Sequence, residues 1–318
     1  MPELPEVETI KKGLEKLVIG YRIVDILADS PKQILPSLKV VKGEVIGLEI
    51  AEIKRRAKLM QVFLKAPREQ QKERRRQLNF SEKEKSVWQA CLLIHLKMTG
   101  RLLVRKPGDP GDEYQRVVIG LEKKYFRSGR QIAGGGLTFP VWKSGEENNL
   151  ELRFCDLRKF GWIKLVKGRE ELEKIMAEFG PEPLDDLTFS YFKRYLASTR
   201  RPVKLALLNQ KKISGIGNIY ANDSLFLAKI DPRRPACGLK EKEVKSVYQS
   251  IHKVLRAGIK YRGASDQHYL DALGQKGAYQ KHFLVYKRDG KKCFSCSGKI
   301  RRIKIGGRGT FYCPRCQN

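Results

Sequence analysis

The chain has 318 residues and 41% hydrophobic composition, which is enough for two domains with a small appendage. Lys and Arg total 65 against 35 Asp and Glu, and the formal net charge of +30 favours nucleic acid as a partner over acidic lipid. No stretch approaches the roughly 18 apolar residues of a membrane span, and no signal peptide is apparent, so we expect an intracellular protein outside the membrane.

The first part of the chain predicts a helix followed by antiparallel strands. Residues 9–18 have helical periodicity, and acidic side chains gather where the positive end of a helix dipole favours them, at Glu3, Glu6 and Glu8. The helix should therefore begin almost at residue 1. Short β-rich runs follow at 23–27, 45–53, 60–64, 90–96, 101–104, 150–154 and 162–166. Two polar or glycine-rich stretches interrupt these runs and are predicted to be exposed insertions, near 68–88 and 122–149.

The second part of the chain is predicted to be helical. Helices are expected near 171–178, 188–197, 202–209, 218–228 and 240–258. A domain boundary is expected at the prolines Pro181 and Pro183, and the chain ends in a short β-rich segment. We therefore expect three parts, which are an N-terminal domain at 1–179, a helical domain at 180–282 and a terminal module at 283–318.

Four of the seven cysteines form a C-x2-C-x16-C-x2-C pattern at the end of the chain, at Cys293, Cys296, Cys313 and Cys316. Two close thiolate pairs on opposing turns suit tetrahedral zinc, and four cysteine ligands leave no open position for catalysis, so we predict one structural zinc ion. A disulfide or redox pair is the lesser alternative. Between the pairs, residues 303–312 predict a hairpin with Gly306 and Gly307 in its turn, and Arg308 beside the tip could contact a phosphate.

The segment 213–220, ISGIGNIY, predicts a glycine turn between two helices. Asn218 is a good N-cap for the second helix, and Gly215 and Gly217 would let backbone N–H groups approach a phosphate there. A simple packing corner is an equally good interpretation of the turn alone. The neighbouring Lys211 and Lys212 favour contact with a DNA backbone.

Together these patterns resemble the formamidopyrimidine-DNA glycosylases of the Fpg/Nei family. The matching segments span the chain outside the two insertions; besides the glycine turn and the cysteine hairpin they are MPELPEVET at 1–9, RRAK at 55–58, HLKMTG at 95–100, DLRKFG at 156–161 and GPEPL at 180–184. The resemblance implies an α+β fold in which a β-sandwich carries the N-terminal helix. It also implies a helix–two-turn–helix domain and a C-terminal zinc finger, with DNA in the cleft between the domains.

The resemblance also implies roles for individual residues. Pro2 would be the nucleophile once Met1 is removed, Glu3 would move protons, and Lys58 would be a basic catalytic or phosphate-binding residue. An α-amino group has a pKa of about 8 against about 10.4 for lysine, so Pro2 should be the better nucleophile at neutral pH unless burial lowers the pKa of Lys58.

Other implied residues would hold the DNA. Asn218 and Arg308 would grip the backbone around an extruded nucleotide. A further set, Met98, Arg158 and Phe160, would fill the hole left in the duplex, and Met98 and Phe160 each lie near a glycine at a turn, where side chains tend to be exposed. The lesion-recognition stretch 263–280 keeps Gly277 and Tyr279, and Tyr279 is expected to contact DNA. Residues 264–268, ASDQH, depart from the family's Gly/Thr-rich pattern.

The implied activity is that of a bifunctional DNA glycosylase and abasic-site lyase. It would act on damaged double-stranded DNA as a monomer in the bacterial cytoplasm, and it would excise oxidised purines such as 8-oxoguanine and formamidopyrimidines through a Pro2 Schiff base and β,δ-elimination. One alternative is an endonuclease VIII-like enzyme for oxidised pyrimidines, whose usual start, MPEGP, differs from this chain at Leu4. The other is a non-catalytic DNA-binding protein, which would have no need of Pro2, Glu3 and Lys58.

Overall fold

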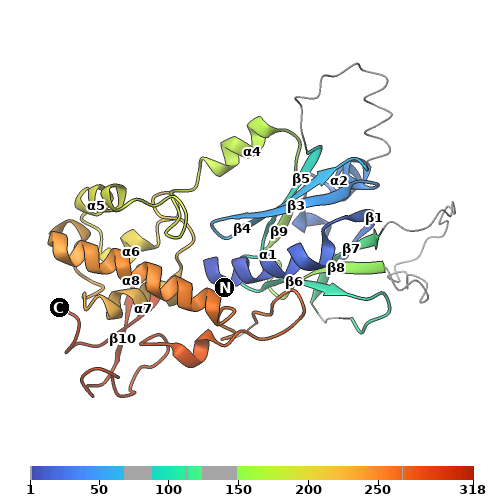
Figure 1. Ribbon diagram of the computed structural model, residues 1–318. Coiled ribbons are helices and arrows are strands. Elements are labelled where there is room, and N and C mark those ends of the chain that lie inside the picture. The colour runs from blue at the N-terminus through green and yellow to red at the C-terminus, as the bar shows by residue number, and fades with distance from the viewer. Residues whose placement is uncertain (1, 68–87, 112–113, 124–148, 267) are drawn as a thin grey trace.

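The computed structural model describes residues 2–67, 88–111, 114–123, 149–266 and 268–318 (Figure 1). The two predicted insertions lie outside the described residues except at their edges. Within the described part of the chain, no helix combines the length and apolar character that a membrane crossing requires.

The N-terminal domain is built on one hydrogen-bonded sheet that has two halves. Among the described residues its strand order is β2-β9-β5-β4-β3-β1-β7-β8-β6, and the halves meet where β1 pairs with β3. The first half contains β2 (Ile34–Leu35), β9 (Trp162–Val166), β5 (Ala90–His95), β4 (Leu59–Lys65) and β3 (Glu49–Arg56). The second contains β1 (Tyr21–Ala28), β7 (Gln115–Lys123), β8 (Asn149–Asp156) and β6 (Gly100–Arg105). Buried side chains from both halves share one core, as the predicted sandwich requires.

Helix α1 (Leu4–Val18) packs into this core. It begins where predicted because a capping box closes its first turn: the backbone N–H of Glu3 donates to the Glu6 carboxylate at 2.8 Å. Its apolar positions recur every three or four residues and are fully buried at Val7, Ile10, Leu14 and Val18. The sequence pattern therefore fixes both where the helix starts and which face it buries.

The prediction of a strand at 45–53 is wrong in its first part. Residues Leu38–Val45 form helix α2, whose N-cap Ser37 accepts a hydrogen bond from the Val40 amide, and β3 starts only at Glu49. The valines in this segment favour strands by propensity, but Val41 and Val45 are buried at a helical spacing of four. Strand β7 was also not predicted; it continues to Lys123, two residues into the expected second insertion.

The helical part forms a second core. It contains α5 (Phe189–Ala197), α6 (Val203–Leu207), α7 (Asn218–Leu227) and α8 (Glu241–Lys260), with short 3-10 turns η2 (Ala236–Gly238) and η3 (Tyr279–His282). Helix α4 (Arg169–Met176) packs instead against β4, β5 and β9 in a separate apolar cluster. These helices confirm the predicted ones to within a few residues. Strands β10 (Arg301–Ile305) and β11 (Arg308–Tyr312) form the predicted hairpin, and Gly306 and Gly307 occupy its turn with φ of 53° and 78°.

A segment that follows α8 crosses back to the N-terminal domain. Tyr269 and Ala272 are buried in the first core, although they lie far along the chain from its strands. The backbone N–H of Val104 in β6 donates to the Ala272 carbonyl at 2.8 Å. We call residues 269–274 the strap, because this segment ties the two domains together (Figure 1).

Candidate active site and nucleic-acid interface

The start of α1 meets the start of α7 in a buried corner. The Glu3 carboxylate accepts hydrogen bonds from the backbone N–H of Ile219 at 2.9 Å and of Tyr220 at 3.5 Å. Gly217 makes this approach possible, since a Cβ there would lie 2.1 Å from Cδ of Glu3. The glycine turn was predicted to present amides to a phosphate; at these two amides the anion is the protein's own Glu3.

Burial shifts the acid–base chemistry of this corner toward neutrality. It raises the pKa of Glu3 to about 7; the positive charge of Lys58 opposes the shift and the nearby Glu6 adds to it. Burial also lowers the pKa of Lys58, against the attraction of Glu3, and the Lys58 ammonium donates to the Ile216 carbonyl at 3.0 Å. A carboxyl group with a pKa near 7 can both give and take a proton at neutral pH.

Glu182, from the GPEPL segment, holds the turn that carries Lys58. Its carboxylate accepts from the backbone N–H of Ala57 at 2.8 Å and from the Arg55 guanidinium. Glu182 is 1% exposed, so these bonds form in a dry contact between the domains. The turn that carries Lys58 is thereby fixed relative to the helical domain as well as to β3 and β4.

Side chains of the helices hold the hairpin, and the sequence did not suggest all of them. Asn222 in α7 accepts from the backbone N–H of Phe311 in β11 at 2.8 Å. Asn218, predicted as N-cap, is the first residue of α7 instead; Gly217 is the N-cap, and the Asn218 amide donates to the Gly309 carbonyl at 3.0 Å. Lys204 in α6 is fully buried and donates to the same carbonyl at 2.9 Å and to the Thr310 hydroxyl at 2.8 Å. Burial lowers the pKa of Lys204 to about 7. These contacts set the position of the exposed Arg308.

A cavity of about 260 Å³ opens at the corner. Five residues singled out from the sequence line it, namely Pro2, Glu3, Met98, Asn218 and Arg308. The loop after α8 contributes Asp266 and His268 to the wall. Concave sites that combine apolar walls with a few charged groups are typical of small-molecule and base-binding pockets.

Beside the cavity, two turns present exposed side chains. Met98, between β5 and β6, is 42% exposed, and Phe160, between β8 and β9, is 54% exposed. The exposure expected for both is confirmed. The Arg158 guanidinium lies 4.7 Å from the centre of the Phe160 ring, so cation–π attraction joins the charged and the apolar member of this group. We refer to Met98, Arg158 and Phe160 as the wedge.

Two further residues expected to bind DNA differ in their placement. Lys211 is exposed just before the glycine turn. Tyr279 is only 2% exposed: its hydroxyl donates to Asp223 at 3.2 Å and its ring stacks on Tyr220 at 5.0 Å. The structure therefore corrects the expectation for Tyr279, which is a core residue of the helical domain.

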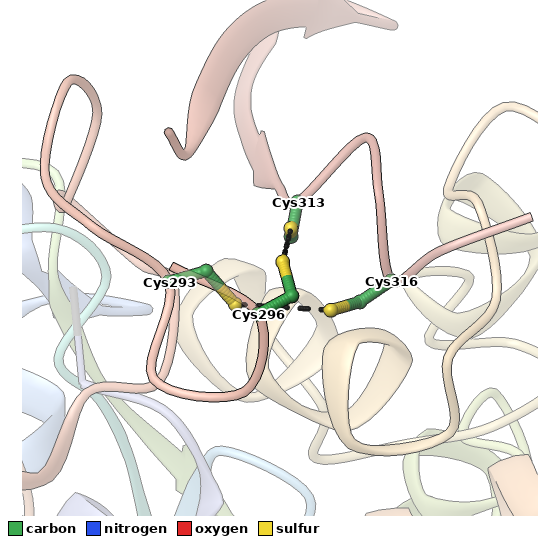
Figure 2. Close-up of side chains that lie close together, drawn as sticks. All are labelled: Cys293, Cys296, Cys313 and Cys316. Atoms are coloured by element: carbon green, nitrogen blue, oxygen red, sulfur yellow. Dashed lines mark hydrogen bonds between the residues drawn. The ribbon is translucent and has the colours of Figure 1, made fainter. Parts of the chain in front are cut away.

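The four terminal cysteines converge as the spacing predicts (Figure 2). Their sulfur atoms all lie within 4.8 Å of one another, with Sγ–Sγ distances of 3.8 Å for Cys293–Cys316 and 3.4 Å for Cys296–Cys313. A tetrahedral zinc with Zn–S bonds of about 2.3 Å separates its sulfurs by about 3.8 Å, whereas a disulfide bond is about 2.05 Å long. The site therefore fits one structural zinc ion, which would join the segments on either side of the hairpin.

Three family models match consecutive parts of the chain. Residues 1–163 match the formamidopyrimidine-DNA glycosylase N-terminal domain, and residues 179–269 match the formamidopyrimidine-DNA glycosylase H2TH domain. Residues 290–318 match the zinc finger found in FPG and IleRS. Together the three matches extend over most of the chain.

Full-length relatives agree with these matches. A formamidopyrimidine-DNA glycosylase from Carboxydothermus hydrogenoformans is 35% identical, with both chains covered completely. Among solved structures, Lactococcus lactis Fpg in complex with DNA containing an abasic site is 29% identical, with a TM-score of 0.80 and complete coverage of both chains. The same protein bound to DNA with an oxidised pyrimidine has a TM-score of 0.79 at 29% identity, again over the whole of both chains.

Proposed function

Because the chain belongs to the formamidopyrimidine-DNA glycosylase family, we propose that it is a base-excision repair enzyme that removes oxidised purines from duplex DNA and then cleaves the abasic site. One observation carries the proposal most directly. The Glu3 carboxyl, with a pKa raised to about 7, lies next to Pro2 in the wall of a cavity that also contains Arg308. A nucleophile, a proton carrier and a phosphate-binding cation are the groups that such a reaction needs.

Pro2 is the proposed nucleophile after removal of Met1. Its secondary amine attacks the sugar C1′, the C1′–base bond breaks, and Glu3 protonates the sugar oxygen as the ring opens to an iminium. The iminium acidifies the C2′ hydrogen; loss of that proton expels the 3′ phosphate and a second elimination expels the 5′ phosphate. Lys58 is the competing amine, and its lowered pKa strengthens that competition. Two observations argue against Lys58 as the nucleophile. Its amine donates a hydrogen bond to the Ile216 carbonyl, and Lys58 is not among the described residues that line the cavity.

The wedge and the surrounding cations would hold the DNA. Met98 and Phe160 would replace the extruded nucleotide in the stack, and the Arg158 guanidinium would read the orphaned base through its fixed donors. Asn218, Arg308 and Lys211 would contact the phosphate backbone. All of these groups come from one chain, which supports action as a monomer, and the bacterial relatives support a role at the DNA in the bacterial cytoplasm.

The proposed substrates are oxidised purines, namely 8-oxoguanine and formamidopyrimidines, paired with cytosine. A second candidate class is the oxidised pyrimidines, because the Lactococcus protein has been captured with such DNA. Duplexes that each carry one defined lesion separate the two under single-turnover conditions. Faster excision of thymine glycol than of 8-oxoguanine would overturn the purine assignment, and so would equal excision of 8-oxoguanine opposite cytosine and opposite adenine.

Borohydride added during turnover tests the nucleophile. We expect a trapped protein–DNA complex whose cross-linked peptide begins at Pro2. Pro2→Gly should retain part of the activity through its primary amine, whereas protein that keeps Met1 should not be trapped. A cross-link at Lys58, or full lyase activity with Met1 in place, would overturn the assignment.

A further inference from the structure

The two turns that carry the wedge connect the same two halves of the sheet. One turn leads from β5 to β6 and the other from β8 to β9. Strand β5 pairs with β9 in the first half, and β6 pairs with β8 in the second. Both turns therefore cross between the first half of the sheet and the second, and the wedge is carried on these two crossings.

A single buried carboxylate lies between these turns. Asp156, the last residue of β8, is 0% exposed. Its Oδ1 accepts from the hydroxyl of Thr99 in the first turn and, at 3.3 Å, from the backbone N–H of Arg158 in the second. The Thr99 hydroxyl oxygen also accepts from that same N–H at 3.1 Å. The two turns thus share one hydrogen-bonded junction.

The other oxygen of Asp156 fixes the far end of the second turn. Oδ2 accepts from the backbone N–H of Gly161 at 2.8 Å and from the Gln33 side-chain amide at 3.3 Å. The Gln33 amide donates in turn to the Gly161 carbonyl at 2.8 Å. Gly161 is itself confined, because a Cβ there would lie 2.6 Å from the Phe154 ring. Asp156 therefore holds the turn that carries Arg158 and Phe160 at both of its ends.

Both turns need such support. Each contains a lysine in the left-handed region, Lys97 with φ of 50° and Lys159 with φ of 56°, a conformation that costs a non-glycine residue roughly 1 kcal/mol. Their tips are exposed, and insertion into a duplex must work against base stacking. Charge-assisted hydrogen bonds to a buried carboxylate are short and directional, which suits them to hold exposed tips in one arrangement.

We propose that Asp156 is a positioning residue that joins the Met98 turn to the Arg158–Phe160 turn, so that the wedge enters DNA as one rigid unit. The inference rests on the proposed function, because it assigns Asp156 to the step in which the nucleotide leaves the stack. Asp156 is fully buried and is not among the described residues that line the cavity. Its loss should therefore slow extrusion and leave the chemistry at Pro2 and Glu3 intact.

The test compares Asp156→Asn with Glu151→Gln. Glu151 lies on the same strand, is 6% exposed and accepts from Arg153 at 2.7 Å, so it is a buried carboxylate away from both turns. Two rates are measured for each variant at a temperature where all are folded: excision of 8-oxoguanine from duplex DNA, and borohydride trapping on an abasic site in single-stranded DNA, which needs no extrusion. A 2-aminopurine base beside the lesion reports the extrusion step by its fluorescence.

We expect Asp156→Asn to lower duplex excision at least tenfold relative to single-strand trapping and to slow the fluorescence change to the same extent. Glu151→Gln should leave that ratio within twofold of the unmodified protein. Thr99→Val removes the shared hydroxyl and keeps the side-chain shape; it should lower the same ratio, and the double variant should add little. This second variant tests the junction even if Asp156→Asn fails to fold.

Equal losses in both rates for Asp156→Asn and Thr99→Val would overturn the inference, since they would indicate general damage to the fold. An unchanged extrusion signal would overturn it as well. Absence of excision by the unmodified protein would instead contradict the proposed function, so the two failures are distinguishable.

Discussion

The corner formed by Pro2, Glu3 and Lys58 is buried at the junction of two domains, whereas the wedge of Met98, Arg158 and Phe160 projects into solvent from turns of one domain. In the corner, burial brings the pKa of Glu3 to about 7, which suits the proposed proton transfer. In the wedge the side chains are exposed, and the buried group beneath them is Asp156.

The two proposed tasks require opposite environments. Proton transfer benefits from a dry setting in which a carboxyl group is no longer held fully ionised at neutral pH. Replacing a base in the stack requires apolar and cationic surface that is free until DNA arrives. Substitutions in the corner and in the wedge should therefore have separable effects.

The largest effect is expected from Glu3→Gln, which keeps the shape of the corner but removes the proton carrier. Excision should fall by about 10²- to 10⁴-fold, the usual contribution of a general acid–base group. Affinity for a duplex with an uncleavable abasic analogue should change by less than about threefold, because the wedge is untouched. Single-turnover kinetics and a binding titration measure the two. Glu15→Gln, at a 37% exposed position of the same helix, is the matched control; a loss below tenfold for Glu3→Gln would contradict its role.

Zinc removal should release Arg308 from the rim of the corner. Without the metal, the four cysteine thiolates no longer hold together the segments on either side of the hairpin. DNA affinity should therefore fall by about a hundredfold, while the N-terminal sheet stays folded. Metal analysis should give one zinc per chain before chelation, and circular dichroism and binding are then compared before and after. Protein purified without chelator that holds no zinc would refute the assignment, as would full affinity after stripping.

Phe160→Ala should weaken the wedge without altering the corner. We expect a loss of about ten- to thirtyfold in duplex excision, since an apolar contact that offsets unstacking disappears. Trapping on single-stranded abasic DNA should be unchanged. Phe294→Ala is the control, because Phe294 is also exposed, at 71%, but belongs to the terminal module. Equal loss of activity on duplex and single-stranded substrates would indicate that Phe160 acts in the chemical step instead.

The difference in stability between the unmodified protein and Glu3→Gln should depend on pH in a way that reports the Glu3 carboxyl. The folded pKa of Glu3, about 7, lies above its ordinary 4.5, so the folded state binds the proton more tightly. This contribution to stability is fully present below pH 4.5 and is lost as the pH rises through 7. The melting temperature of the unmodified protein, relative to that of Glu3→Gln, should therefore fall between pH 5 and pH 8. A flat difference over that range would mean that Glu3 is ionised throughout.

Lys211→Ala should have the smallest effect. Removing one phosphate contact should lower affinity a few-fold for every sequence and reduce the slope of log affinity against log salt by about 0.9. Lys174→Ala, at a 74% exposed position of α4 paired with Glu170, should leave the slope unchanged. If Lys211→Ala changed the lesion preference and left the salt slope intact, the assignment of Lys211 to the phosphate backbone would be wrong.

Features set by local spacing could be predicted from the sequence. The cysteine pattern gave the zinc site, the glycines gave the turns, and neighbouring glycines indicated that Met98 and Phe160 are exposed. The roles of Asp156 and Lys204 could not be predicted, because their hydrogen-bond partners are remote in the sequence. Gln33 is 123 residues from Asp156, and Thr310 is 106 residues from Lys204. The spacing of apolar residues along the sequence gives no signal for such long-range pairs. Tyr279 was misassigned for the same reason, since its burial depends on Asp223 and Tyr220.

The strap is synthesised long after the rest of the N-terminal core that it completes. Ala272 fills a place in the first core against Gly13, where a Cβ on the glycine would lie 3.0 Å from that of Ala272. A ribosome that adds about 5–20 residues per second needs roughly 5–18 s to travel the 92 residues from position 180 to position 272. During that interval the residues of the N-terminal domain have been synthesised, but the strap that completes its core has not. A nascent chain arrested before the strap should therefore be more sensitive to protease than the finished protein.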